Sequence, residues 1–359
     1  MHQIPPEKPL VVLVIAVGGN VSQGILKALA LSDLPTRVIG TDISPQQMGL
    51  HSVDVAYVAP WANDPGFVDW CIGICKREKV DVILSGCEPV LRPLAAHRAH
   101  IEAESGAVCF VTSPEILEIC DDKYNTCAWL EANGLPFPAY AAAVDAAGLE
   151  KLAQEHGFPL IAKPRRGGGS QGVMQLEDDW DLRYIARKHG YVVQEYLGNP
   201  QSEYTVGCFH DCNGALCGSM VLWRELLAGT TYRAEAGAFP EVRAAAEAIA
   251  QTLRPQGPCN IQIRMTPRGP VCFEINPRFS GTTPIRARMG FNEVDAALRH
   301  FVLGEAAPKL PEVHQGVALR YWNELYAGDE ALTALEATGE LRHSAETLGW
   351  VEDYGMPPA

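Results

Sequence analysis

The sequence predicts an α/β protein that opens with a doubly wound parallel sheet and continues into a region of β-hairpins. Strand and helix patterns alternate up to about residue 115, as expected for a parallel sheet with helices on both faces. Further along, paired segments alternate apolar and polar residues around turns, which is typical of antiparallel hairpins. The chain has 359 residues and a mass of 39.0 kDa, enough for two or three domains.

The first part begins with a continuous apolar run at Leu10–Val17, which favours a buried parallel strand. A glycine turn follows, and a helix is expected to begin near Val21. Further strands are expected at 36–40, 80–85 and 108–112, and helices at 67–78 and 91–101. The glycine turn, together with Asp42 after the second strand, is similar to a dinucleotide-binding fold. A strict G-x-G-x-x-G pattern is broken here, so NAD binding is kept only as an alternative.

The middle of the chain predicts a small unit of strands and helices around a glycine-rich loop. Helices are expected at 114–120, 121–132, 149–156 and 180–189, and strands at 159–164, 173–176 and 191–197. The loop Gly167–Gly172 holds four glycines, so its backbone N–H groups can approach phosphate oxygens closely. Lys163, just before the loop, can neutralise phosphate charge. The alternative for an isolated glycine run is a flexible surface hairpin.

A later hairpin carries residues suited to metal and phosphate chemistry. Two apolar strands flank a turn at 265–270, and side chains along a strand alternate between faces. Glu274, Asn276 and Arg278 are therefore expected on one face, with Gln262 brought beside Glu274. Carboxylate and amide oxygens suit Mg²⁺, and a guanidinium group can bind a phosphoryl oxygen. The alternative is an amphipathic hairpin whose polar face meets water.

Three weaker features accompany these motifs. Lys123 follows paired aspartates and is a second candidate for binding phosphate. Backbone groups of the linker 194–197 can hydrogen-bond an adenine edge, with Leu197 packed on the ring. Glu203 can accept hydrogen bonds from ribose hydroxyls. Taken singly, each of these residues is more often an ordinary surface residue.

Composition limits the partners that are expected. The formal net charge is −14, which argues against nucleic acid or an anionic membrane as the main partner. Eleven cysteines without regular spacing fit a reducing cytoplasm better than a disulfide framework. No apolar stretch is long enough to span a bilayer. A cytoplasmic protein with small-molecule substrates is therefore expected.

The order of the motifs resembles the ATP-grasp superfamily, and most closely one synthetase unit of the carbamoyl-phosphate synthase large chain. The resemblance covers roughly residues 10 to 305 and includes glutamine rather than an acid at the first metal position. It implies an ATP-grasp fold with an N-terminal Rossmann-like pre-grasp domain, a small mobile α+β lid and a larger β-rich C-terminal domain. The implied boundaries are 1–115 for the first domain, 116–197 for linker helices and lid, 198–310 for the domain with the metal site, and 311–359 for a tail packing on the core.

The resemblance also implies roles for individual residues. The expected ATP ligands are Lys123, Lys163, Gly168, Gly169, Ser170, Gln171, Gly172, Gln194, Glu195, Tyr196, Leu197 and Glu203. Gln262, Glu274 and Asn276 would bind two Mg²⁺ ions, with Mn²⁺ as an alternative metal. Arg278 and Lys163 would act on the transferred phosphoryl group as catalytic residues.

The activity implied is that of an ATP-dependent carboxylate–amine ligase, which forms an amide through an acyl phosphate and releases ADP and phosphate. The chain holds one synthetase unit and no recognisable glutaminase segment, so carbamoyl-phosphate synthesis itself is not expected. A small-molecule phosphotransferase and a non-catalytic nucleotide-binding protein are the alternatives. Family habit suggests a homodimer.

Substrate residues are expected outside the nucleotide motifs. Glu88 follows a strand of the first domain, at the edge where open α/β sheets bind ligands, and can hold a substrate amine. Arg224 and Arg286 are candidates for a carboxylate pocket. Each of these residues has a structural alternative: a helix N-terminal acid for Glu88 and an ion pair for either arginine.

Overall fold

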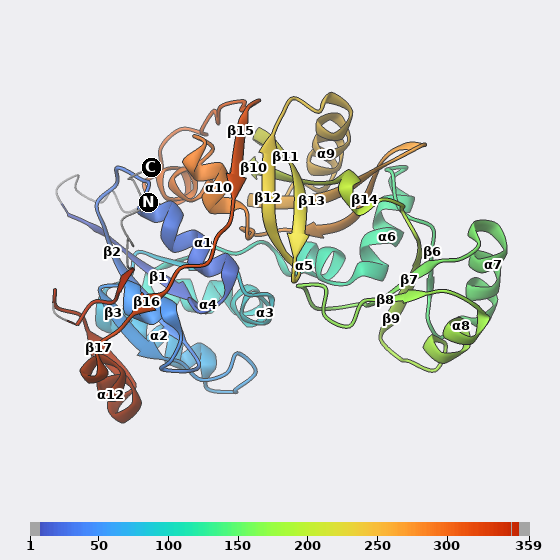
Figure 1. The fold of residues 1–359 in the computed structure, drawn as a ribbon. Coiled ribbons are helices and arrows are strands. Elements are labelled where there is room, and N and C mark those ends of the chain that lie inside the picture. Colours follow the sequence, from blue (N-terminus) through green and yellow to red (C-terminus); the bar gives the residue numbers. More distant parts are fainter. Residues whose placement is uncertain (1–7, 346, 352–359) are drawn as a thin grey trace.

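The computed structural model describes residues 8–345 and 347–351, which fold around three main sheets. A six-stranded, mostly parallel sheet forms the first domain, and a four-stranded antiparallel sheet forms a small domain. The third is a six-stranded antiparallel sheet, which we call the large sheet. Figure 1 shows the small domain extending away from the other two sheets.

The first domain is a doubly wound sheet, as predicted. Its strand order is β17-β3-β2-β1-β4-β5, and strands β1 to β5 run parallel. The strands are β1 Leu10–Ile15, β2 Thr36–Asp42, β3 Val55–Val58, β4 Val82–Ser85 and β5 Val108–Cys109. The helices are α1 Asn20–Leu29, α2 Phe67–Glu78, α3 Glu88–Ala96 and α4 Arg98–Ser105.

Two details of this domain differ from expectation. The short strand β3 was not predicted, so the strand near 80–85 is the fourth of the sheet and not the third. The single helix expected at 91–101 is two helices, which meet at His97. Strand β1 explains the uninterrupted apolar run, because Leu13 and Ile15 pack into one core and Val12 and Val14 into another on the opposite face.

The small domain pairs its strands in the order β6-β9-β7-β8. These are β6 Tyr140–Ala142, β7 Leu160–Pro164, β8 Met174–Leu176 and β9 Tyr191–Glu195. The two helices are α7 Ala146–His156 and α8 Asp179–Ile185. Their N-cap residues are Asp145 and Asp178, whose carboxylates accept from backbone N–H groups of the first turn. Two linker helices, α5 Pro114–Asp121 and α6 Lys123–Ala132, connect the first domain to this unit.

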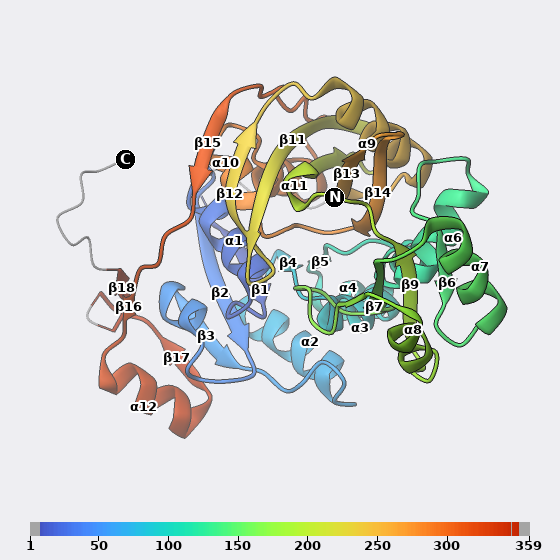
Figure 2. The same ribbon diagram turned by 45° about the vertical axis from the view of Figure 1, so that its right-hand side comes forward.

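The large sheet has the strand order β14-β13-β10-β11-β12-β15. Figure 2 shows β12 of this sheet between β15 and β11. Its strands are β10 Glu203–His210, β11 Leu216–Leu227, β12 Thr230–Ala236, β13 Gly257–Thr266, β14 Gly269–Asn276 and β15 Gly316–Leu319. Helix α9, Pro240–Leu253, packs on one face and was not among the expected elements. The short helices α10 Thr283–Arg288 and α11 Glu293–Ala297 lie between this sheet and helix α1.

The tail after residue 310 adds a strand to two sheets. Strand β15 pairs with β12 of the large sheet, and β17, Glu340–Arg342, pairs with β3 of the first domain. Helix α12, Asp329–Thr338, lies between them in sequence, while β16 Leu325–Tyr326 pairs with β18 Trp350–Val351. Arg342 of β17 pairs with buried Glu78 of helix α2. Burial would raise the pKa of the Glu78 carboxyl, but bonds from Arg342, Tyr57 and Arg37 lower that pKa to about 2. The tail is thus anchored by a buried carboxylate.

All eleven cysteines are free thiols. Within residues 8–345 and 347–351, none of the helices combines the length and apolar character needed to cross a bilayer.

Candidate active site

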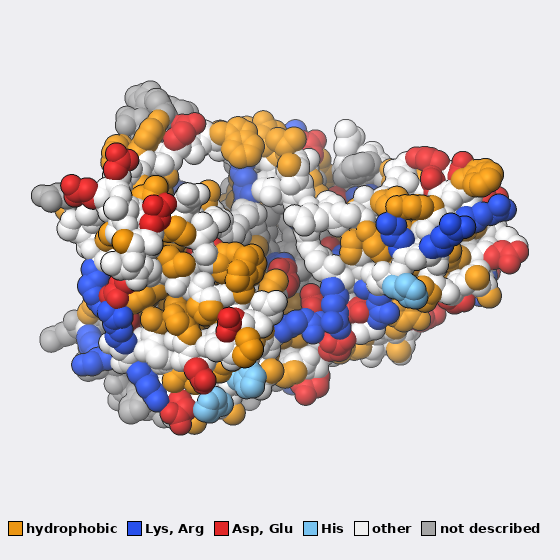
Figure 3. Space-filling model, turned by 90° about the horizontal axis from the view of Figure 1, so that it is seen from below, with side chains coloured by type: hydrophobic (Ala, Val, Ile, Leu, Met, Phe, Trp, Pro, Cys, Tyr) orange, Lys and Arg blue, Asp and Glu red, His pale blue; other side chains and the backbone are white. Residues whose placement is uncertain are grey.

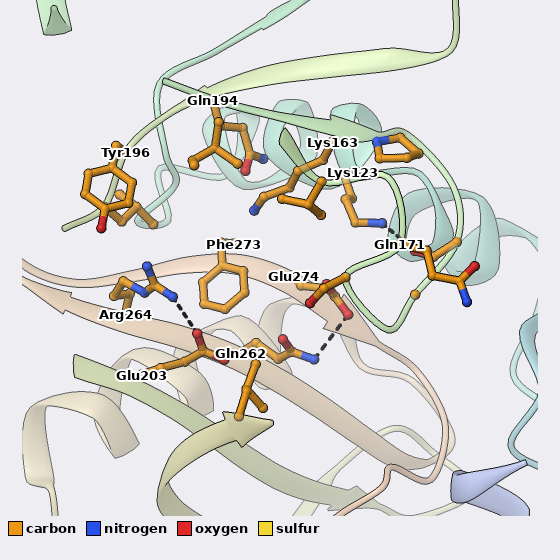
Figure 4. A pocket seen from close by; sticks show the side chains of 18 of the residues that line it. Lys123, Lys163, Gln171, Gln194, Tyr196, Glu203, Gln262, Arg264, Phe273 and Glu274 are labelled. Atoms are coloured by element: carbon orange, nitrogen blue, oxygen red, sulfur yellow. Dashed lines mark hydrogen bonds and ion pairs between the residues drawn. The ribbon is translucent and has the colours of Figure 1, made fainter. Parts of the chain in front are cut away.

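Two cavities meet beside Glu274. The first, of about 210 Å³, lies between the small domain and the large sheet (Figure 4). The second, of about 630 Å³, lies between the first domain and the large sheet. Gly167, Gly168, Gln171, Gln262 and Glu274 line both. Figure 3 shows a hollow in one face of the molecule with acidic and basic side chains gathered at its edge.

Two lysines reach the first cavity from the side of the small domain (Figure 4). Lys163 ends strand β7, and its ammonium lies 4.9 Å from the centroid of the Phe273 ring. Burial lowers the pKa of Lys163 to about 8, while the Glu274 carboxylate partly opposes that shift. Lys123 begins helix α6, is buried, and donates from Nζ to the carbonyl of Gly167 at 2.6 Å. Lys123 therefore helps to hold the glycine loop.

The glycine loop needs its glycines for backbone conformation. Gly167, Gly169 and Gly172 have φ values of 102°, 65° and 70°, a region that side chains with a Cβ atom rarely adopt. Ser170 and Gln171 line the first cavity, as do Gly167 and Gly168. Gly169 lines only the second cavity, and Gly172 lines neither, since it lies against Pro164 and Tyr191.

The hairpin of β13 and β14 has the predicted register. Gln262 lies opposite Glu274, and Asn260 lies opposite Asn276. Glu274 Oε1 accepts from Gln262 Nε2 at 3.1 Å and from Asn276 Nδ2 at 2.9 Å. Arg278 donates to Asn276 Oδ1 at 2.9 Å, so these polar side chains form one continuous cluster. The expectation that they share a face is confirmed.

The linker 194–197 lines the first cavity, although part of its backbone is already bonded. The N–H of Glu195 donates to Ala139 at 2.9 Å, and the Glu195 carboxylate pairs with Arg268. The Gln194 amide is buried and donates to the thiol of Cys127. Backbone groups of Tyr196 and Leu197 are therefore better placed than Glu195 to meet a ligand edge.

Glu203 faces the first cavity but is held by two arginines. Its carboxylate pairs with Arg224 at 2.7 Å and with Arg264 at 2.5 Å. Burial would raise the pKa of Glu203, but these two guanidinium groups outweigh it and lower the pKa. Arg264 was missed in the sequence, although Glu203 and Arg264 are direct neighbours on β10 and β13 and form an opposite-charge pair across strands.

Two of the three expected substrate residues line the second cavity. Glu88 begins helix α3. Its partial burial would raise the pKa of the carboxylate, but the pair with Arg278 outweighs this and lowers the pKa. Arg224 is buried and donates to Glu203 and to Gln262 Oε1 at 2.8 Å. Both residues therefore reach the cavity with a partner of opposite charge already in place.

Arg286 does not fit a substrate role, and that expectation is corrected. Its side chain has no exposed surface and pairs with buried Glu293 at 2.7 Å. It also donates to Thr282 at 2.6 Å and to Ser280 at 3.1 Å. An arginine sealed within such a network organises the loop before helix α10. A substrate would have to break the ion pair to reach it.

Asp42 is not free to bind a dinucleotide ribose. Its two carboxylate oxygens accept from the backbone N–H groups of Gly18 at 2.7 Å and Ile43 at 2.8 Å. The side chain of Gln47 occupies the space over Gly18, where a dinucleotide would pass. The geometry therefore does not favour the NAD alternative.

Comparison with known proteins agrees with this architecture. Residues 187–325 match the family described as ATP-grasp in the biosynthetic pathway with Ter operon. Residues 12–109 match the PylC-like N-terminal domain.

Curated relatives share part of the chain. The carbamoyl phosphate synthase large chain of Mycobacterium tuberculosis is 28% identical over 232 residues, which are 59% of this chain and 20% of the relative. An uncharacterized protein of Sinorhizobium fredii, y4rH, is 30% identical over 213 residues, 53% of this chain and 43% of the relative. The glutamate–LysW ligase of Sulfurisphaera tokodaii is 28% identical over 120 residues, 30% of this chain and 43% of the relative. The chain thus spans about a fifth of the synthase and less than half of the other two.

Solved structures share the fold at low identity. The N5-carboxyaminoimidazole synthetase of Staphylococcus aureus with ADP has a TM-score of 0.67 at 15% identity, covering 97% of this chain and 94% of that one. The biotin carboxylase domain of the Hydrogenobacter thermophilus 2-oxoglutarate carboxylase, with MgADP, ADP and bicarbonate, has a TM-score of 0.67 at 15% identity, covering 90% and 76%. The chain therefore has the ATP-grasp fold behind a PylC-like N-terminal domain, and it is homologous to the carbamoyl phosphate synthase large chain.

Proposed function

We propose that this chain is an ATP-dependent carboxylate–amine ligase that works through an acyl phosphate. The observation that carries the proposal is the position of Glu274 and Gln262, which line both cavities. A nucleotide in the first cavity and an acceptor in the second would meet at these two side chains. Relatives with this fold bind ADP or MgADP in their solved structures.

The residues of the first cavity suit a nucleoside triphosphate. Lys163 supplies a positive charge near Glu274, and the glycine loop held by Lys123 covers the phosphate side of the cavity. Tyr196 and Leu197 provide a backbone edge for the adenine, and Glu203 is the candidate for the ribose hydroxyls.

Gln262, Glu274 and Asn276 suit a hard divalent cation, because they offer carboxylate and amide oxygens in one cluster. Both amide nitrogens now donate to Glu274, so each amide would turn its oxygen toward an ion. We assign two Mg²⁺ ions to this cluster, with Mn²⁺ as the alternative. Bound ions would neutralise charge on the β- and γ-phosphates.

The proposed reaction has two steps. A carboxylate oxygen of the acceptor attacks the γ-phosphorus, the bond to the β-phosphate oxygen breaks, and ADP leaves. An amine then attacks the acyl carbon, phosphate leaves with the bonding electron pair, and the amine loses a proton as the amide forms. We assign the transferred phosphoryl group to Arg278, whose guanidinium is bonded to Asn276 and Glu88. The glycine loop keeps water from the acyl phosphate.

We also infer a homodimer with small-molecule carboxylate and amine substrates. The related biotin carboxylase domain was solved as a dimer. Size-exclusion chromatography with light scattering measures the mass directly, and a mass of one chain at micromolar concentration would contradict the dimer.

The test of the ligase is ADP release from Mg-ATP across a panel of amino acids and other carboxylates, with hydroxylamine present. Carboxylate-dependent ADP together with a hydroxamate is the expected result, because hydroxylamine traps an acyl phosphate. A phosphorylated product stable to hydroxylamine would instead identify a phosphotransferase. Tight Mg-ATP binding without turnover on any acceptor would favour the non-catalytic alternative.

A further inference from the structure

The small domain is joined to the rest of the chain by two crossings that meet at Glu195. The chain enters the domain before strand β6, at Ala139, and leaves it after strand β9, which ends at Glu195. The N–H of Glu195 donates to the carbonyl of Ala139 at 2.9 Å, and the N–H of Ala139 donates to Glu195 Oε1 at 2.7 Å. A buried glutamate thus ties the two crossings together.

Arg268 holds this junction from the large sheet. It lies in the turn between β13 and β14, the hairpin that also carries Gln262 and Glu274. Its guanidinium binds both oxygens of the Glu195 carboxylate, with Nη1 2.9 Å from Oε2 and Nη2 bonded to Oε1. Nη2 also donates to the carbonyl of Phe137, in the entering crossing, at 3.3 Å. One arginine therefore contacts both crossings.

A second arginine of the same hairpin meets the far end of the linker proposed for the adenine. Arg264 donates to the carbonyl of Gly198 at 3.2 Å. Gly198 has φ 82°, a left-handed backbone conformation that glycine adopts readily. Tyr196 and Leu197 lie between the two arginine contacts and line the first cavity. Figure 4 shows Tyr196 and Arg264 at one end of that cavity, away from Lys123.

The two arginines differ in their relation to the first cavity. Arg264 lines it and pairs with Glu203, so it belongs to the proposed nucleotide site itself. Arg268 lies outside the lining of the cavity, and its side chain is 48% exposed. Arg268 can therefore act on a nucleotide chiefly through Glu195 and the linker backbone. Exposed ion pairs contribute little to stability, so a merely structural Arg268 would leave base preference unchanged.

A linker backbone distinguishes the two purines by the positions of its donor and its acceptor. Adenine donates from N6 and accepts at N1, whereas guanine accepts at O6 and donates from N1. An N–H and a carbonyl that fit adenine are therefore mismatched for guanine in the same place. This discrimination requires a fixed backbone, because a linker that shifts can present its groups to either base.

We infer that Arg268 is a positioning residue for base recognition, an inference that rests on the proposed nucleotide site. Its two-pronged bond to Glu195 and its bond to Phe137 fix both crossings against the hairpin that carries Glu274. The linker backbone is thereby held in place relative to the cluster assigned to Mg²⁺, so that one nucleotide reaches both ends of the first cavity. Arg268 itself touches neither the base nor the phosphates.

The test measures binding of Mg-AMP-PNP and Mg-GMP-PNP to the whole chain by calorimetry, with the weaker ligand measured by displacement. Arg268→Met removes the guanidinium and keeps an apolar stem, and Arg268→Lys keeps the charge without the planar fork. The control is Arg98→Met in the first domain. Arg98 is also partly exposed, pairs with Glu102 at 3.1 Å and donates to the carbonyl of Val111 at 3.2 Å.

We expect wild-type protein and Arg98→Met to prefer AMP-PNP over GMP-PNP to the same extent. Arg268→Met should bind AMP-PNP about tenfold more weakly with little change for GMP-PNP, because only the matched base gains from a fixed linker. Arg268→Lys should lie between Arg268→Met and wild type.

A base preference of Arg268→Met equal to that of wild type, whether or not both affinities fall, would overturn the inference. A wild-type chain that binds Mg-AMP-PNP without preference over Mg-GMP-PNP would also overturn it. Failure of the wild-type chain to bind Mg-AMP-PNP would instead contradict the proposed function.

Discussion

The two cavities differ in how their cations are held. In the first cavity, Arg264 pairs with Glu203, but the two lysines are unpaired: Lys123 and Lys163 bond to a carbonyl and to an aromatic ring, and neither forms an ion pair with a carboxylate of the described residues. In the second, every arginine of the lining has a carboxylate partner: Arg92 with Asp121, Arg166 with Glu118, Arg224 with Glu203 and Arg278 with Glu88. Unpaired ammonium groups suit a highly charged polyphosphate. Paired guanidinium groups are fixed in place and suit recognition by shape and hydrogen bonding.

The largest effect is expected at Glu274, which the two cavities share. Glu274→Ala removes the carboxylate assigned to the metal ions, and we expect ADP release with Mg-ATP to fall at least about 100-fold. The fold should be unchanged, because Glu274 is not part of a buried core. Glu150→Ala, at an exposed position on α7, is the matched control. Wild-type turnover by Glu274→Ala would show that neither cavity depends on this site.

Substitution of Arg286, which lies outside both cavities, tests whether this residue has a structural role and not the expected substrate role. Arg286→Met leaves Glu293 buried without its partner, and we expect the free energy of unfolding to fall by about 3–5 kcal/mol. Burial already raises the pKa of Glu293, and loss of the guanidinium would raise it further. The folded variant would then bind a proton that the unfolded chain releases, so its relative stability should decrease as pH rises above 4.5, the ordinary pKa of this group.

Urea denaturation at pH 4 and pH 7 measures this effect. Arg288→Met, at an exposed position on the same helix, provides the control. If Arg286→Met were as stable as wild type but had a higher KM for the acceptor, Arg286 would be a substrate residue after all.

The sequence was informative where local pattern decides structure. Alternation along 259–278 predicts the hairpin, but strict pairing from the turn would set Gln262 opposite Phe273. A β-bulge at Phe273 brings Gln262 opposite Glu274 instead. Helix α9 was not predicted, although a proline at its start and several alanines along it are local signals for a helix. The tail strands β15 and β17 have only 4 and 3 residues, and their pairing depends on partners far away in sequence. Burial of Arg286 likewise depends on Glu293 and on the loop it organises, which no local pattern shows.

The unpaired Lys163 of the first cavity should make nucleotide affinity depend on pH. Its pKa of about 8 means that the ammonium is charged below pH 8 and loses its proton above it. Nucleotide affinity should therefore be constant below pH 8 and decrease as pH rises beyond it. Lys163→Met should weaken ATP binding about 10- to 100-fold below pH 8 and remove this pH dependence.

Calorimetric titration of Mg-AMP-PNP at pH 7 and pH 9 checks both parts. Lys151→Met, on the exposed face of α7, is the control. An unchanged affinity in Lys163→Met would mean that the first cavity does not use its unpaired lysine.

The smallest effect is expected where a charge is already paired. Glu88→Ala removes the partner of Arg278 in the second cavity and, of the two lysines of the first, affects Lys123 only through a weaker electrostatic interaction. We expect the KM for the acceptor to change about tenfold, with Mg-AMP-PNP affinity unchanged, because the pair is one-third exposed on the Glu88 side. The conservative variant Glu88→Gln keeps a hydrogen bond to Arg278 and should lie between Glu88→Ala and wild type. A loss of nucleotide affinity in Glu88→Ala would show that the two cavities do not act separately, since Arg278 would then link acceptor recognition to the nucleotide.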